Sequence, residues 1–274
     1  MISHAADRAV IQRIWGSIDP ILLIFAGSAA EFALSKAVDW LFFTRALPND
    51  PITRFFETVH FAQALAFEDE ATALETVRAV NKAHASVEAA RGGRIPQWSY
   101  RDTLFMLVDY GERAHAIVFG PMSEADRRAH FAYSMEGGAQ LGIKGLPSRY
   151  EDYQGMRQTH LRNHLKRSAL TDDLYRAYRA AVGPARYHGL RAVQASLVPD
   201  TVARQLDLRR NPAIDALLRG YRHVRQRWLL RLLCPILLPR GYGRQLAALE
   251  RRTTPQPTRV RPTDASNWRS DPRP

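Results

Sequence analysis

The chain has 274 residues and a net charge of +12, with 46% apolar and 24% charged residues. These proportions are typical of a globular protein that buries a core and exclude a fibrous or disordered chain. The charge is concentrated, because residues 201–274 contain sixteen arginines, no lysine and five acidic residues, and so carry +11 of the total. Aromatic residues are not interleaved with these arginines, so we predict no nucleic-acid partner. An acidic membrane surface or an acidic protein fits the pattern better.

The cysteine content and the N-terminus indicate the compartment. Cys234 is the single cysteine, which excludes an intrachain disulfide and a cysteine metal cluster and favours a reducing compartment. The first residues lack the basic-then-apolar order of a secretion signal. Residues 20–43 are apolar, but Glu31, Lys36 and Asp39 interrupt them, so we interpret this stretch as a buried core helix. We expect a cytoplasmic protein, either free or peripherally attached to a membrane.

Helical signals follow one another along the chain. Apolar residues recur at three- and four-residue steps in four segments: 21–43, 55–67, 73–90 and 104–118. Ser123, Ser148 and Thr171 are expected to begin three more helices, which end near residues 140, 165 and 182. Further helices are expected after Pro184, Pro199 and Pro212.

These elements predict an all-α protein. We expect a single multi-helix bundle domain over residues 1–252, followed by a disordered tail, rich in proline and arginine, over residues 253–274. Before the tail, residues 228–239 are apolar and arginines flank them. The wider segment 219–244 therefore suits attachment to an acidic membrane surface. The alternative is that the apolar stretch closes the core of the bundle.

Histidines are the main candidates for chemistry, since the sequence lacks phosphate-binding loops, nucleophile elbows and Cys-His metal patterns. Two Glu-x-x-His pairs occur: Glu57 with His60, and Glu112 with His115. In di-iron carboxylate bundles two such pairs are completed by one glutamate from each of two other helices, and Glu31 and Glu88 are available. A dinuclear iron site is therefore one hypothesis, with a chance spacing as its alternative. His160 and His164, four residues apart, suit a metal or an ordinary pairing at the surface.

Several motifs, taken in order, resemble a known family. Asp50-Pro-Ile-Thr-Arg-Phe-Phe-Glu-Thr58 is followed by His84-Ala-Ser-Val, by Ser99-Tyr-Arg-Asp and by Leu141-Gly-Ile-Lys-Gly-Leu-Pro. Together they resemble the oxygenase family that contains the mycophenolic-acid pathway oxygenase and the latex clearing protein. The resemblance covers roughly residues 20–208. It implies an all-helical fold, dioxygen activation and oxidative cleavage of a carbon–carbon double bond in an isoprenoid chain.

The resemblance also implies a cofactor and a site. In rubber-cleaving members a histidine that matches His84 ligates the iron of haem b, with an arginine and a threonine that match Arg54 and Thr58 nearby. A neutral imidazole is a good axial ligand, and Arg54 and Thr58 share one helix face. Without the family, His84 reads as a core histidine bonded to a carbonyl. Glu57 stands where rubber-cleaving members carry a lysine, so any second axial ligand there is lost or changed.

The sequence thus predicts a haem-dependent oxygenase that acts on a hydrophobic small molecule, isoprenoid or lipid-like. Arg54, Glu57 and Thr58 are the candidate catalytic residues, and His84, Arg54 and Thr58 the candidate haem-binding residues. The alternatives are a non-haem di-iron oxidase and a non-catalytic binding protein that associates with membranes.

Overall fold

The computed structural model describes residues 5–44, 49–224 and 249. This part of the chain contains twelve helices: α1 Ala5–Trp15, α2 Ile18–Phe32, α3 Asp39–Thr44, α5 Pro51–Phe67, α6 Glu70–Arg91, α7 Gln97–Val118, α8 Glu124–Gln140, α9 Tyr150–Asn163, α10 Ala169–Val182, α11 Pro184–Leu197, α12 Asp200–Gln205 and α13 Pro212–Val224. The described residues form no strand beyond an isolated bridge between Ser35 and Leu165. The all-α prediction is confirmed. The predicted tail at 253–274 and the apolar stretch 228–239 lie outside the described residues.

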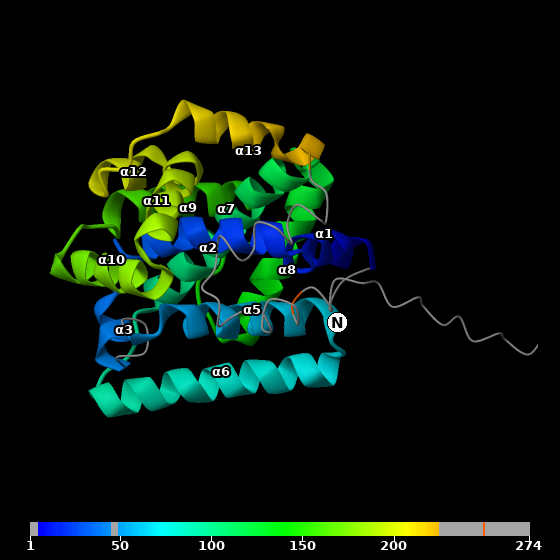
Figure 1. Ribbon diagram of the computed structural model, residues 1–274. Coiled ribbons are helices and arrows are strands. Elements are labelled where there is room, and N and C mark those ends of the chain that lie inside the picture. The colour runs from blue at the N-terminus through cyan, green and yellow to red at the C-terminus, as the bar shows by residue number, and fades with distance from the viewer. Residues whose placement is uncertain (1–4, 45–48, 225–248, 250–274) are drawn as a thin grey trace, which may run out of the picture.

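Helices α2 and α7 form the centre of the bundle, and the other helices surround them (Figure 1). Ten of the fifteen residues of α2 are buried, because apolar side chains occupy most of its circumference. Gly27 lets the two helices approach closely, since a Cβ at this position would lie 2.3 Å from ring atoms of Tyr110. α5 packs beside this centre, and α6 lies along the outer side of α5 at the edge of the molecule (Figure 1).

The predicted helix of residues 21–43 is two helices, which corrects the sequence interpretation. After α2 the backbone bonds to a distant segment instead of continuing the helix. The amide of Lys36 donates to the carbonyl of His164 at 2.9 Å, and the amide of Lys166 donates to the carbonyl of Leu34 at 2.7 Å. These bonds use the groups that a continuous helix needs for its own ladder. Helix α1 was not expected from the sequence.

The capping predictions have mixed outcomes. Ser123 is confirmed as the cap of α8, because its hydroxyl accepts a hydrogen bond from the backbone three residues on, at 3.0 Å. Ser148 is wrong as a cap, since α9 begins after Arg149 without a side-chain bond. α10 begins one turn earlier than predicted, because Ser168 and Thr171 form a reciprocal capping box.

Among the described residues, no single helix is both long enough and apolar enough to cross a membrane. Arg8–Trp15 and Ile18–Phe32 reach the required length only when taken together, and they meet at an 80° bend.

Candidate functional site

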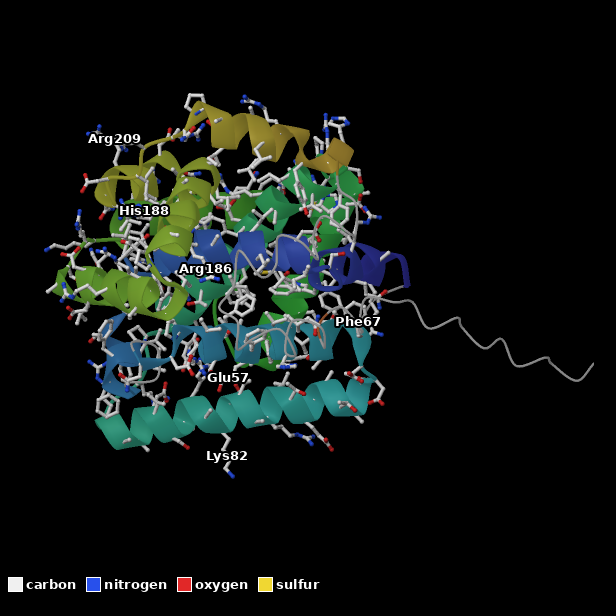
Figure 2. The ribbon with its side chains drawn as sticks, in the orientation of Figure 1. Glu57, Phe67, Lys82, Arg186, His188 and Arg209 are labelled. Carbon is white, nitrogen blue, oxygen red and sulfur yellow. The ribbon has the colours of Figure 1, made fainter. Side chains whose placement is uncertain are left out.

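Helices α5 and α6 carry the residues of the predicted haem site and lie side by side (Figure 1). Only Ala73 and Val77 of the 22 residues in α6 are buried. Lys82 points away from α5, whereas Glu57 lies on the side of α5 that faces α6 (Figure 2). Two residues after Lys82 the helix has turned by about 200°. His84 therefore lies on the inner face of α6, where it is half-buried.

The imidazole of His84 makes an aromatic contact and no hydrogen bond to any described residue. Its ring packs against the ring of Tyr100, with centroids 5.0 Å apart and planes tilted by 54°. Among the described residues, neither ring nitrogen has a hydrogen-bond partner. Burial lowers the pKa of His84 below its usual value, the Arg54 guanidinium lowers it further, and the carboxylate of Glu88 opposes both. A lowered pKa favours the neutral imidazole at pH 7, and no carbonyl among the described residues bonds to the ring.

The α5 residues of the predicted site share one turn. The Arg54 guanidinium forms an ion pair with the carboxylate of Glu57, and both side chains are partly exposed. The Thr58 hydroxyl donates a hydrogen bond to the backbone carbonyl of Arg54 at 3.0 Å. The charge of Arg54 acts on His84, so these two side chains lie near each other where α5 packs against α6.

The residues at this site fit a haem group. His84 offers an uncommitted neutral nitrogen, which is the ligand that haem iron takes from histidine. Val80 and Val87, which lie one turn before and one turn after it, are only half-buried and leave an apolar surface beside the ring. Arg54 supplies a cation of the kind that pairs with a propionate carboxylate.

The four residues of the dinuclear iron hypothesis do not meet. Glu57 and His60 are exposed on α5. His115 is buried, and its Nδ1 lies 2.9 Å from the carbonyl of Gly120. Among the described residues, no metal-sized group of three ligands includes any of the four. The Glu-x-x-His spacing places two side chains on the same face of a helix, but it does not determine which residues of other helices lie opposite them. The two pairs are therefore not brought to one metal-sized site among the described residues.

The glutamates of that hypothesis also have other partners. Both carboxylate oxygens of Glu112 accept a hydrogen bond from the Tyr150 hydroxyl at 2.9 Å. Burial raises the pKa of Glu112 to about 7, although the bond from Tyr150 acts in the opposite direction. Glu88 accepts a hydrogen bond from the backbone amide of Ile95 at 2.9 Å. Glu31 is buried in an ion pair.

A buried polar network surrounds Glu31 in the centre of the bundle. Arg157 on α9 donates to both oxygens of Glu31, with Nη2 to Oε2 at 2.6 Å. The Tyr110 hydroxyl donates to the same carboxylate at 3.0 Å, and Arg157 also pairs with Asp109 at 2.8 Å. Burial raises the pKa of Glu31, but the charge and hydrogen bonds of Arg157, with those of His160, outweigh burial and lower it to about 2. Glu31 is therefore ionised.

The network continues to the surface through three further side chains. His160 has its Nε2 2.9 Å from Glu31 and its Nδ1 2.7 Å from Oδ2 of Asp102. Nδ1 of His164 contacts the same oxygen of Asp102. All three residues line a cleft of about 470 Å³. Sequence reasoning singled out the two histidines and missed Asp102, although its position three residues before the buried Phe105, on the same apolar face, was a signal.

The comparison with family models covers most of the chain. Residues 15–232 match the family described as "ER-bound oxygenase mpaB/B'/Rubber oxygenase, catalytic domain". The match includes all the residues described on α5, α6, α7 and α9. The search of curated proteins and the search of solved structures each find no match. Since the match extends over most of the sequence and confirms the resemblance of the motifs, the chain belongs to the mpaB and rubber oxygenase catalytic-domain family.

Proposed function

We propose that the protein is a haem-dependent oxygenase that acts on a hydrophobic alkene, with His84 as the axial ligand of the haem iron. The observation that carries the proposal is the state of His84: half-buried, neutral and without a hydrogen-bond partner among the described residues. A histidine in the core normally satisfies its ring nitrogens with other protein groups. Haem, when bound, supplies an iron centre at which dioxygen is activated.

The neighbouring residues have distinct parts in this proposal. His84 donates the lone pair of a neutral imidazole, and the charge of Arg54 helps to keep that imidazole unprotonated. Arg54 would also pair with a haem propionate, which would compete with the Glu57 carboxylate for the guanidinium. The Thr58 hydroxyl donates its hydrogen to the Arg54 carbonyl. Its oxygen lone pairs therefore remain able to accept a hydrogen bond from a bound group.

A hydrophobic substrate is supported by the apolar surface around the site. Phe55, next to Arg54, makes an edge-to-face contact with Phe25 on α2 at 4.3 Å between centroids. Both rings are half-buried, as are Val80 and Val87 on α6. Such a surface suits an isoprenoid or lipid-like chain, because apolar area gains free energy when it leaves water.

Isotope labelling tests the reaction. Cleavage of one carbon–carbon double bond by one dioxygen molecule gives two carbonyl groups and needs no external reductant. We expect the haem-loaded protein to convert squalene under ¹⁸O₂ into carbonyl products that carry ¹⁸O, when they are reduced at once with borohydride and analysed by mass spectrometry. The haem-free protein is the control. Absence of products, or oxygen that derives from water, would contradict the proposal.

We further propose that the basic end of the chain holds the protein at an acidic membrane surface. On α13, Arg219 and Arg222 are exposed and Leu217 is 59% exposed. The helix therefore presents both cationic and apolar side chains to its surroundings. Residues 225–244 of segment 219–244 lie outside the described residues. Arginines near an anionic surface contribute about 1 kcal/mol each, so Arg219→Gln with Arg222→Gln is expected to weaken vesicle binding roughly 30-fold. Equal co-sedimentation of both proteins with anionic vesicles would remove this idea.

A further inference from the structure

The three side chains at the surface end of the buried network have the arrangement of a metal site. One nitrogen from each of His160 and His164 and one oxygen from Asp102 all lie within 4.8 Å of one another. Two of the ligands come from successive turns at the end of α9, and the third comes from α7. Two imidazoles and one carboxylate suit Zn²⁺ or Fe²⁺, whereas Mg²⁺ and Ca²⁺ prefer oxygen ligands.

The orientation of His160 is fixed from its other side. Its Nε2 lies 2.9 Å from Glu31, which Arg157 and Tyr110 hold in place. Metal-bound histidines commonly donate their second ring nitrogen to a carboxylate in this way, which sets the tautomer and the ring plane. Nδ1 of His160 is left to face Asp102, and the side chain is only 3% exposed.

The contact between His160 and Asp102 is unusual for a hydrogen bond. Nδ1 of His160 and Oδ2 of Asp102 are 2.7 Å apart, yet this buried nitrogen has no aligned hydrogen-bond partner among the described residues. A nitrogen and a carboxylate oxygen that lie this close without an aligned hydrogen bond are compatible with two ligands of one ion.

His164 and the cleft complete the site. The backbone carbonyl of His164 accepts a hydrogen bond from Lys36, and its ring packs on Trp98 with centroids 4.5 Å apart. The backbone of His164 is therefore fixed, and its ring is positioned by Trp98 and by the contact with Asp102. The cleft in front of the three ligands has a volume of about 470 Å³ and is open to solvent, which leaves coordination positions for water or a small molecule.

We propose that Asp102, His160 and His164 bind one divalent transition-metal ion of the Zn²⁺ or Fe²⁺ type. This site is separate from the haem site at His84. Both adjoin the first turns of α7, but Tyr100 packs against His84 whereas Trp98 and Asp102 contact His164. Residues 98 and 102 share a helix face, and residue 100 lies on the opposite one. The N-terminal part of α7 thus stands between the two sites.

Calorimetric titration of the untagged full-length protein with Zn²⁺, after chelator treatment, tests the site. We expect one Zn²⁺ per chain. Changes in groups that only orient a metal ligand cost 10–100-fold in affinity, so His164→Ala, which removes a ligand, is expected to weaken binding by roughly 100-fold or more. Asp102→Asn is the second variant, because it keeps the size of the side chain and weakens the carboxylate ligand.

Two control variants make the result specific. His188→Ala removes an exposed histidine on α11 and is expected to leave Zn²⁺ binding unchanged. His84→Ala is also expected to leave it unchanged, which separates this site from the haem site. Absence of Zn²⁺ binding by the wild-type protein, or equal binding by the wild-type protein, His164→Ala and Asp102→Asn, would overturn the proposal.

Discussion

Arg157→Met is expected to lower the free energy of unfolding by about 3–5 kcal/mol, because it leaves the buried carboxylate of Glu31 without its cation. Glu31 is fully buried, and the Tyr110 hydroxyl and His160 do not replace two charged hydrogen bonds. Urea denaturation followed by circular dichroism measures the effect. Arg128→Met is the matched control, since Arg128 is half-exposed and its pairs with Glu124 and Glu151 lie at the surface, where such pairs contribute about 0–1 kcal/mol.

The pH dependence of this effect has a defined sign. The pKa of Glu31 is lowered to about 2 from an ordinary value of 4.5, so its ion pair stabilises the folded protein fully above pH 4.5 and loses that effect as the pH falls towards 2. In Arg157→Met the unpaired carboxyl resists ionisation, and the variant loses stability as the pH rises. The difference between the two proteins is therefore largest near neutral pH and shrinks in acid. A loss of under 1 kcal/mol in Arg157→Met, or a difference that grows in acid, would contradict the ion pair described above.

His84→Ala is expected to abolish haem retention and, with it, oxygenase activity. The substitution removes the nitrogen that we assign to the iron. Because His84 has no hydrogen bond to lose among the described residues, the variant is expected to keep the thermal midpoint of the wild-type protein. Bound haem itself stabilises a folded protein, so thermal midpoints are compared between the haem-free forms of the variant and the wild-type protein. Loss of the cofactor is thereby distinguished from loss of the fold. Titration with haemin, followed by absorption, measures the change.

The control for this variant is His188→Ala, which removes an exposed histidine at a distance from α6 (Figure 2). It is expected to bind haemin as the wild-type protein does. Imidazole added to His84→Ala is expected to restore part of the haem absorption, because it fills the space left by the side chain. If His84→Ala retained the wild-type spectrum and activity, the assignment of His84 would be wrong.

Helices whose positions depend on apolar periodicity and capping residues were predictable from the sequence. Apolar periodicity found α5 to α7, and Ser123 marked the start of α8. The break after α2 was not predictable, because it depends on backbone bonds to residues 164–166, which are distant in sequence. The end of α2 is determined by a tertiary contact, and the spacing of apolar residues along the sequence does not indicate such a contact.

The site was predictable only in part, for the same reason. The motif order placed Arg54, Thr58 and His84 at one site. In the structure Arg54 and Thr58 share one turn of α5, and the charge of Arg54 acts on His84 on α6. Glu31 was considered only as an available ligand in the di-iron alternative, whereas its partner is Arg157, which lies 126 residues further along the chain. Helix spacing identifies which side chains share a face, but the charge that meets that face comes from another helix.

The absorption spectrum of freshly purified wild-type protein, with iron and haem content per chain, tests the central claim most directly. With haem bound through His84, we predict a Soret band and one haem per chain, either as purified or after addition of haemin. A colourless protein that takes up no haemin would contradict the proposed function.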